Sequence, residues 1–339
     1  MALDADRIRQ LRAALLSWYA RSCRSLPWRG ESDPYRIWVS EVLLQQTQVA
    51  TAVPGFHKFL RAFPNLETLA AAPLQSVLQV WQGFGYYRRA EQLHAAAQQL
   101  VREGWPSSRA GWSRLPGIGP YTSAAIAAIW LGEPCSAIDA NVRRVLARLY
   151  AELQPSFSWL VRRSDQLLDR SQPGRWAEAL MDLGATVCRP ARPACPECPW
   201  RPQCAAARAG SPQAYPAPKP RYRTARAAAV LVMSSGGRYL LEQRGAGGLW
   251  AGLWGVPAEW LGRTDSQEAA LERLLDRFSA TDPQALGRLR YLLTHRTLEL
   301  SVYRAQGPSD PLRYLDPAEV PLSSADRRIL QLAGVRVER

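Results

Sequence analysis

Lysine is almost absent from this 339-residue sequence, in which Lys58 and Lys219 are the only two. The formal net charge of +14 at pH 7 therefore comes almost entirely from arginine, whose guanidinium suits bidentate contacts with phosphate. A basic balance of this size indicates a polyanionic partner, nucleic acid before a membrane surface. Charge alone does not decide between those two partners.

Long apolar runs are also missing. No stretch approaches the roughly 20 consecutive apolar residues that a bilayer span needs, and residues 1–12 mix acidic and basic side chains among apolar ones. We therefore expect a protein of the cytoplasm or nucleoid. The sequence has no internal repeat of fixed period and no coiled-coil heptads. Its apolar content of 47% is enough to form a core in each of about two domains.

The pattern of apolar residues changes once along the chain. Residues 4–183 predict successive helices, with breaks at Pro54–Gly55, Pro64, Pro73, Gly83 and Gly104. Residues 211–220 contain four prolines and predict a stiff, extended linker. Beyond the linker, short β-like runs at 228–233, 239–243 and 298–303 surround one helical stretch at 266–278, which indicates an α+β domain.

Four of the six cysteines are clustered with the spacing C-x6-C-x2-C-x5-C: Cys188, Cys195, Cys198 and Cys204. Disulfides are rare in reducing compartments, so four thiolates suit either zinc or an iron–sulfur cluster. Zinc ribbons usually show two C-x2-C pairs, whereas this run has one pair and two unequal longer gaps. The spacing therefore favours iron–sulfur over zinc. Interleaved prolines predict a loop without helix or strand. Cys23 and Cys135 are isolated, and we expect them to be small buried apolar residues.

This cysteine run resembles the cluster loop of the endonuclease III and MutY branch of the helix-hairpin-helix DNA glycosylases, which holds one [4Fe-4S] cluster. The resemblance extends over nearly the whole chain. It implies an all-α catalytic region at residues 1–210, with a six-helix barrel at about 30–135, a cluster subdomain at about 1–29 and 136–210, and the cluster loop at 188–204. A linker at 211–225 and an α+β Nudix-like domain at 226–339 follow.

The basic residues between 188 and 226 outnumber the single acid, Glu197, eight to one. This segment is a candidate phosphate-contacting surface, with a solvated basic loop as the alternative reading. The implied partner is double-stranded DNA, bound by a monomer.

A glycine-rich turn lies between two helical stretches at Leu115-Pro-Gly-Ile-Gly-Pro-Tyr-Thr122. Gly117 and Gly119 permit a tight turn with outward-facing N–H groups, and the following helix adds its positive N-terminal dipole. Together these groups suit a phosphate, although such a turn is often only a turn. Leu115, Gly117 and Gly119 match the helix-hairpin-helix of the family, which implies a DNA contact.

Glu41 lies in an apolar stretch and has Ile37, Trp38, Leu44 and Gln45 as its helical neighbours, so we expect no basic residue to be placed to pair with it. Desolvation without a partner raises a carboxyl pKa, which is what a general acid at neutral pH requires. At a spacing of i, i+4 and i+7, Glu41, Gln45 and Gln48 would share one face of a helix. The alternative reading is a solvated helix face.

Asp139 precedes an amphipathic helical stretch in Ile-Asp-Ala-Asn-Val, where a helix N-cap would stand. Capping and catalysis are equally good explanations from the residues alone. The resemblance implies that Asp139 stabilises the cationic sugar and that Asn141 and Tyr121 help to hold the sugar and the carboxylates. Ala140 stands where the family commonly has glycine.

The resemblance also implies that adenine leaves its mispair with 8-oxoguanine or guanine, protonated at N7 by Glu41 after flipping out of the helix stack. Trp28 and Arg29 match the adenine pocket of the family. Residues that contact or wedge beside the opposite base are Gln46, Thr47 and Tyr86. Bifunctional relatives carry a nucleophilic lysine where Tyr121 stands, so an endonuclease III type lyase is the weaker alternative. A non-catalytic iron–sulfur DNA-binding module is another.

The C-terminal half resembles the Nudix-like domain that the family uses to read 8-oxoguanine, most closely at residues 247–257. Hydrolase activity of the Nudix type needs a dense glutamate motif, which Glu268, Glu272 and Asp276 do not make up. The recognition loop of the family reads Phe-Ser-His, whereas this chain has Leu293-Thr294-His295. Thr294 and His295 are therefore the candidate residues for reading the opposite base.

Overall fold

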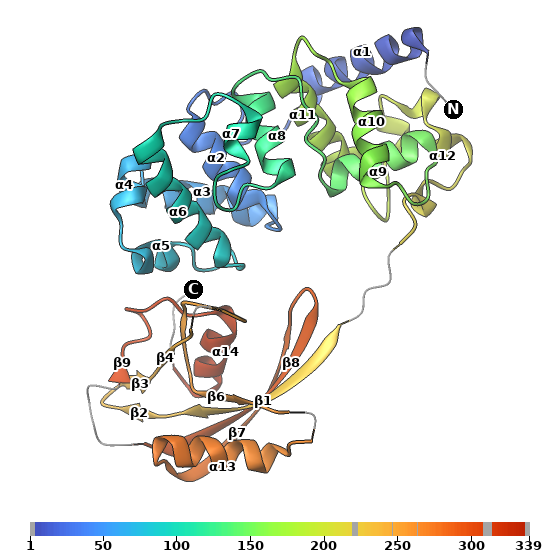
Figure 1. The fold of residues 1–339 in the computed structure, drawn as a ribbon. Coiled ribbons are helices and arrows are strands. Elements are labelled where there is room, and N and C mark those ends of the chain that lie inside the picture. The colour runs from blue at the N-terminus through green and yellow to red at the C-terminus, as the bar shows by residue number, and fades with distance from the viewer. Residues whose placement is uncertain (1–3, 219–222, 246, 263, 308–313, 336–339) are drawn as a thin grey trace. The chain divides into compact units, whose positions relative to one another are not determined.

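The computed structural model describes residues 4–218, 223–245, 247–262, 264–307 and 314–335 (Figure 1). The chain divides into two compact units. Unit 1 consists of residues 1–60, 65–70 and 95–219, and unit 2 consists of residues 61–64, 71–94 and 220–339. Within the described ranges, no helix is long and apolar enough to cross a membrane.

The described part of the chain before residue 219 is helical, as the sequence predicts. Its helices are α1 (Ala5–Ser22), α2 (Pro34–Leu44), α3 (Val49–Ala62), α4 (Leu66–Ala71), α5 (Leu74–Val80), α6 (Arg88–Glu103), α7 (Arg109–Trp112), α8 (Pro120–Ile129), α9 (Ala140–Tyr150), α10 (Phe157–Leu167), α11 (Pro173–Asp182) and α12 (Ala205–Arg208). A π-helical turn at Leu183–Val187 extends α11. Short 3-10 turns follow at Cys195–Glu197, Arg201–Gln203 and Pro212–Ala214.

Side-chain caps explain where several helices begin. Asp4, Asp33, Asp139 and Ser156 each accept a hydrogen bond from a backbone N–H in the first turn of the helix that follows. The predicted break at Pro54 is wrong, because α3 continues through this residue. The helix loses one backbone hydrogen bond there, but its buried face packs regardless, through side chains that include Phe56 and Phe59.

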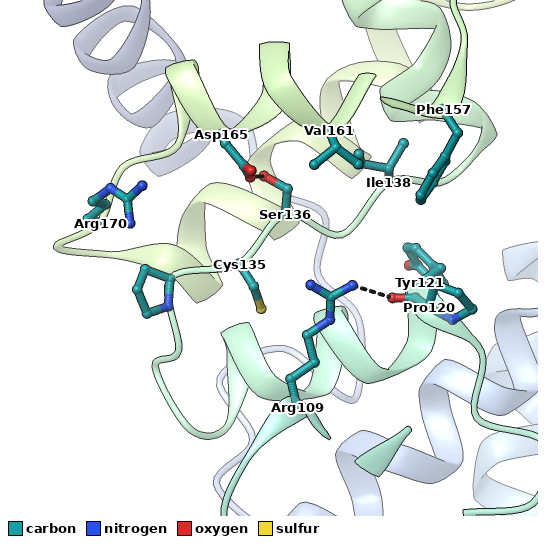
Figure 2. Close-up of a pocket in the computed structure, with 11 residues that line it drawn as sticks. Arg109, Pro120, Tyr121, Cys135, Ser136, Ile138, Phe157, Val161, Asp165 and Arg170 are labelled. Carbon is teal, nitrogen blue, oxygen red and sulfur yellow. Dashed lines mark hydrogen bonds between the residues drawn. The ribbon is translucent and has the colours of Figure 1, made fainter. Parts of the chain in front are cut away.

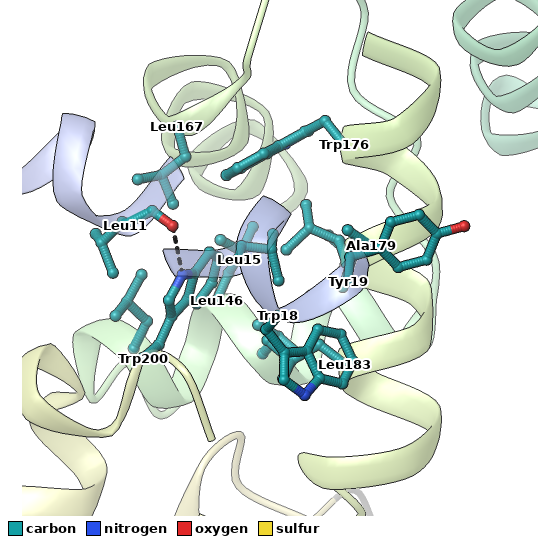
Figure 3. Packing of buried hydrophobic residues seen from close by; sticks show 14 of the residues in the cluster. Leu11, Leu15, Trp18, Tyr19, Leu146, Leu167, Trp176, Ala179, Leu183 and Trp200 are labelled. Carbon is teal, nitrogen blue, oxygen red and sulfur yellow. Dashed lines mark hydrogen bonds between the residues drawn. The ribbon is translucent and has the colours of Figure 1, made fainter. Parts of the chain in front are cut away.

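A large apolar core holds α1, α9, α10 and α11 of unit 1 together (Figure 3). Leucines and aromatic rings dominate it, and the indole of Trp200, from the cysteine-bearing loop, enters the same core. The indole N–H of Trp200 donates to the backbone oxygen of Leu11 across 2.9 Å. The loop is thus anchored to α1 by a buried aromatic side chain.

Two of the predictions for the loop and the linker need correction. The proline-rich cysteine loop is not free of helix, because it contains two 3-10 turns. The linker is not simply extended, since residues 212–214 form another such turn and the N–H of Ala217 donates to the backbone oxygen of Leu153 across 2.8 Å. Residues 219–222 of the predicted linker, including Lys219, lie outside the described residues.

Unit 2 contains the α+β part of the chain that the sequence predicts. Its elements after residue 220 are β1 (Thr224–Val232), β2 (Ser234–Ser235), β3 (Arg238–Leu240), β4 (Glu242–Gln243), β5 (Trp254–Gly255), β6 (Ala258–Trp260), α13 (Gln267–Phe278), β7 (Thr281–Leu292), β8 (Arg296–Gln306), β9 (Tyr314–Leu315) and α14 (Ser324–Leu332). The main sheet has the order β6-β1-β8-β7, with β1 and β8 parallel and the other neighbours antiparallel.

The second half of strand β1, residues 228–232, is buried on both faces of this sheet. Ala228, Val230 and Val232 point into one core, which includes Ile329 of α14. Ala229 and Leu231 point into the other core, which includes residues of α13. The alternation of side chains along a strand explains how one short apolar run serves two cores.

Candidate active site

Glu41 is buried in unit 1, on α2. Asp33 caps this helix and Pro34 occupies its first turn, so the sequence itself sets where the helix starts. The side chain is 5% exposed, and its Oε2 has no hydrogen-bond partner among the described residues. Burial raises the pKa of Glu41 to about 7, although a hydrogen bond with Tyr121 and the charge of Arg29 act in the opposite direction. At neutral pH the group is thus poised to donate a proton.

Arg29 is the basic neighbour that the helical spacing around Glu41 did not reveal. Its guanidinium pairs with Glu178 at 2.7 Å and with Asp182 at 2.8 Å. Burial opposes the charge of Arg29, but the carboxylates of Glu178 and Asp182 outweigh burial and raise the pKa of Arg29. Arg29 therefore stays charged, and two carboxylates share its charge.

The acidic pair on α11 was missed by the sequence analysis. Asp182 is fully buried and also pairs with Arg24 at 2.6 Å, while Glu178 accepts a hydrogen bond from the hydroxyl of Tyr19 across 2.8 Å. The sequence feature that could have indicated this pair is the four-residue spacing of Glu178 and Asp182, which places both acids on one face of a helix. Their partners come from residues 19–29, about 150 positions earlier in the chain.

Asp139 is the N-cap of α9. Its Oδ1 accepts from the N–H of Val142 at 2.7 Å, and its Oδ2 accepts from the side-chain amide of Asn141 at 2.8 Å. Burial raises the pKa of Asp139, while the hydrogen bonds from Val142 and Asn141 lower it. The amide oxygen of Asn141 in turn accepts from Arg144 at 2.8 Å. Both oxygens of the carboxylate are thus held in place.

Tyr121 links the Glu41 carboxyl to the hairpin. It stands at the second position of α8, and burial and the charge of Glu41 raise the pKa of its hydroxyl well above the ordinary value. The hydroxyl also lies 3.4 Å from the Sδ of Met181. Tyr121 is therefore protonated at neutral pH and is a donor toward Glu41.

Tyr121 also lines a cavity of about 190 Å³, together with Arg109, Cys135, Phe157 and Asp165 (Figure 2). Glu41 and Asp139 are not among the residues that line it. The thiol of Cys135 is buried, donates to the backbone oxygen of Ala124 and has its pKa raised to about 11 by burial. Cys135 is thus a buried, unreactive thiol, as expected, whereas Cys23 is exposed, contrary to the prediction.

The glycine-rich hairpin has an open tip. Gly117 adopts a φ of +76°, a conformation that favours glycine, and Gly119 is the N-cap of α8. A Cβ atom added at Gly119 would meet no other atom within 4 Å. Leu115 is buried beneath the turn and its backbone oxygen accepts from the N–H of Ile118. The backbone around Gly119 is therefore accessible to a ligand.

The predicted polar stripe of Glu41, Gln45 and Gln48 does not exist on one helix. Helix α2 ends at Leu44, and the next helix, α3, starts only at Val49. The side-chain amide of Gln45 donates to Thr122 on α8 at 3.0 Å, while Gln48 is exposed. The helical spacing does not hold here because a turn interrupts the helix after Leu44. This turn directs Gln45 and Gln48 away from a common face.

Gln46 and Tyr86 share an unusual backbone conformation. Their φ values are +58° and +47°, in the left-handed region that non-glycine residues rarely occupy. Such conformations gather at binding sites. Both residues are exposed, Tyr86 by 44% of its surface. Thr47, half-buried beside Gln46, directs its hydroxyl to the backbone oxygen of Gln45 at 3.5 Å.

Trp28 is a core residue in this structure. It is 5% exposed, and its ring packs edge-on against Phe56 with the ring centroids 5.3 Å apart. Its neighbour Arg29 contributes the charged group, as described above. The two adjacent residues are thus a buried aromatic ring and a cation paired with two carboxylates.

In unit 2, the structure brings Tyr86 and Thr294 together. Their hydroxyls are hydrogen-bonded, and His295 is exposed in the same turn between β7 and β8. The side chains of Gln79, Gln82 and Tyr87 also donate to backbone oxygens of Ala318, Val320 and Leu322. Residues 71–94 therefore pack in the same unit as the C-terminal part of the chain. The sequence did not predict this grouping.

The four clustered cysteines stand at one end of unit 1. Burial raises the pKa of Cys198, and the three other thiols, those of Cys188, Cys195 and Cys204, act in the same direction. All four sulfurs are therefore close enough to interact electrostatically. In the part of the chain that the structure describes, no three His, Cys, Asp or Glu side chains are grouped so as to hold one metal ion.

Comparison with known proteins places these features in a family. Residues 39–156 match the model of the HhH-GPD superfamily base excision DNA repair proteins, and residues 228–332 match that of the NUDIX domain. The chain is 34% identical to the adenine DNA glycosylase of Homo sapiens, over 88% of this chain and 67% of that protein. It is 33% identical to that of Rattus norvegicus, over 88% of this chain and 71% of that protein.

Among solved structures, a thermostable thymine-DNA glycosylase is similar with a TM-score of 0.56 and 26% identity, over 61% of this chain and 100% of that one. The likeness to the two adenine DNA glycosylases extends over a larger share of the chain. The chain belongs to the adenine DNA glycosylase family, within the helix-hairpin-helix superfamily of base excision repair.

Proposed function

We propose that this chain hydrolyses the N-glycosidic bond of adenine mispaired with 8-oxoguanine or guanine in double-stranded DNA. The observation that carries the proposal is the Glu41 carboxyl, which is buried, has a free Oε2 and has a pKa of about 7. A general acid works best when its pKa lies near the operating pH. The named activity of the relatives supports adenine as the base that is released.

The proposed reaction begins when adenine flips out of the duplex. Glu41 donates its proton to N7 of the base, the bond between C1′ and N9 breaks, and its electron pair leaves with the adenine. The sugar becomes a cation, which the carboxylate of Asp139 stabilises. Water adds to C1′ and gives a proton back to Glu41, so that adenine and an abasic site are the products.

The remaining site residues would orient these groups. Asn141 holds one oxygen of Asp139, and Tyr121 donates toward Glu41. Trp28 and Arg29 would form a wall of the adenine pocket. Because Tyr121 stands where a lyase would have a lysine, cleavage uses water and the enzyme is monofunctional.

DNA recognition would be shared by both units. The open hairpin at Gly117 and Gly119 would receive a phosphate on its backbone N–H groups and on the positive end of α8. Gln46, Thr47 and Tyr86 would contact the base opposite adenine. In unit 2, Thr294 and His295 would distinguish 8-oxoguanine from guanine.

The four cysteines fit a [4Fe-4S] cluster better than a single ion. Ligands of one zinc ion stand about 2.3 Å from it and must therefore crowd together. Each cysteine of a four-iron cluster instead binds its own iron, so the thiolates stand further apart. The C-x6-C-x2-C-x5-C spacing and the mutual electrostatic influence of the four thiols support the second arrangement. Cys188, Cys195, Cys198 and Cys204 would hold the cluster, which would supply a cross-link between segments and a one-electron centre.

A single-turnover assay tests the proposed function. Duplexes with A opposite 8-oxoguanine, A opposite G and, as a control, A opposite T are incubated with excess enzyme, and abasic sites are revealed by alkali. We expect excision from the first two duplexes and little from the third. Release of thymine or oxidised pyrimidines without release of adenine would contradict the proposal.

A further inference from the structure

Arg148 is the most heavily bonded buried cation in the described part of unit 1. It lies on α9, one turn after Arg144, and is 2% exposed. Its guanidinium donates to backbone oxygens of Cys188 at 3.3 Å, Arg189 at 2.7 Å, Pro190 at 2.7 Å and Tyr215 at 3.1 Å, and to the Sγ of Cys188 at 3.4 Å.

None of these partners is a carboxylate. Among the described residues, Arg148 forms no ion pair with Asp or Glu. Burying a cation without a counter-charge is costly, so such groups are normally paired. The Sγ of Cys188 lies 3.4 Å from this guanidinium, so a cluster held by this sulfur would place its negative charge beside Arg148.

The carbonyl contacts have a second consequence. Three consecutive backbone oxygens, of Cys188, Arg189 and Pro190, accept from the same guanidinium and are fixed against α9. The planar fork of arginine can span several acceptors at once, whereas a lysine ammonium is a point charge on a flexible stem. The turn that presents the Cys188 sulfur is therefore shaped by Arg148.

We propose that Arg148 is a positioning residue for the iron–sulfur cluster: it shapes the Cys188–Pro190 turn and places a fixed cation beside the Cys188 thiolate. This inference rests on the cluster assigned above. Hydrogen bonds to cluster sulfurs and nearby positive charge favour the reduced, more negative state of a cluster. Arg148 therefore raises the reduction potential of the cluster and slows its loss. The contact with Tyr215 joins the start of the linker to the same point.

Arg148→Met and Arg148→Lys in the full-length protein, purified without oxygen, test this proposal. Arg201→Met is the matched control, because Arg201 also lies between cluster cysteines but is exposed and makes no side-chain hydrogen bond among the described residues. Two quantities are measured: the reduction potential at an electrode and the rate of iron release to a chelator.

We expect Arg148→Met to shift the potential to more negative values. It should also release iron about 10- to 100-fold faster, the usual effect of losing a partner of a metal ligand. Arg148→Lys should keep most of the potential, since it keeps the charge, but should release iron faster, since the fork is lost. Arg201→Met should change neither quantity by a comparable amount.

The outcomes separate this inference from the cluster assignment. Wild-type protein that holds zinc or no iron would overturn the cluster itself. Wild-type protein with four irons, together with an unchanged potential and release rate in Arg148→Met, would overturn the role of Arg148 alone. If Arg148→Met retains no cluster, Arg148→Lys decides: faster release than wild type supports the proposal, and an equal rate contradicts it.

Discussion

Asp182 pairs with Arg29 across 2.8 Å, and Arg29 is one of the two groups that lower the pKa of Glu41. The wholly buried carboxylate of Asp182 thus offsets part of the positive charge that would otherwise act on Glu41. Glu178 shares this role at 2.7 Å from Arg29. The acidity of Glu41 is therefore set by residues about 140 positions away in the chain as well as by its own burial.

Replacing Asp182 by Asn should move the pH dependence of adenine release to lower pH. Arg24 and Arg29 lose a shared counter-charge, so the pKa of Glu41 falls and its acid form is lost at lower pH. Breaking a buried pair on one side also costs about 3–5 kcal/mol of unfolding free energy. A single-turnover pH profile and urea denaturation measure the two effects. Asp6→Asn, at an exposed aspartate of α1 that pairs with Arg9, is the control. An unmoved pH profile in a folded Asp182→Asn protein would contradict this coupling.

Glu41→Gln should abolish adenine release while duplex binding stays within a fewfold of wild type. The amide keeps the shape of the side chain but has no proton to give to N7, and general acid catalysis contributes about 10²–10⁴-fold. Single-turnover rates and a gel-shift titration on the same duplex measure the two quantities. Near-normal turnover would place the acid on another residue.

The same variant should change how stability depends on pH. Folding raises the pKa of Glu41 from the ordinary 4.5 to about 7, so the native state holds a proton that the unfolded chain has released. Ionisation of Glu41 therefore lowers the free energy of unfolding as the pH rises between those two values. Glu41→Gln should match wild type near pH 4 and exceed it at pH 8 by up to about 3 kcal/mol. Equal stability at both pH values would show that Glu41 is not buried as described.

Borohydride should not trap wild-type enzyme on DNA at the active site. Trapping needs an amine that forms a Schiff base with the sugar, and Tyr121, the residue that we expect at the lysine position of the lyases, has none. A gel assay for covalent complexes, with peptide mapping of any adduct, checks this expectation. Weak adducts at Lys58, Lys219 or the N-terminal amine are compatible with it. A strong adduct within residues 115–122 would restore the lyase reading.

Thr294→Ala should lower the preference for adenine opposite 8-oxoguanine over adenine opposite guanine by about fivefold, since one hydrogen bond contributes about 1 kcal/mol. Tyr86→Phe removes the same hydroxyl contact and should have a similar effect. The double variant should then lose no more than either single one. Thr281→Ala, at an exposed threonine of β7, is the control. Additive losses would mean that the two hydroxyls act independently.

Much of this protein could be predicted from local pattern. Apolar periodicity determined the helical first part and the α+β second part, and capping chemistry placed Asp139 at the start of α9. Glu41 is buried because its helix is apolar on nearly every side, a property that is visible in the residues themselves. These features depend on neighbours within one or two turns of the chain, and such neighbours are known from the sequence.

What the sequence could not determine depends on partners that are distant along the chain. The turn after Leu44 separates Gln45 from Gln48, and a helical spacing cannot reveal a turn that has no proline or glycine. The partners of Arg29, the bonds of Arg148 to the cysteine loop and the grouping of residues 71–94 with the C-terminal part arise only when helices pack. A buried charge is stable only beside its partner, and tertiary packing decides which of many acids, carbonyls or sulfurs that partner is.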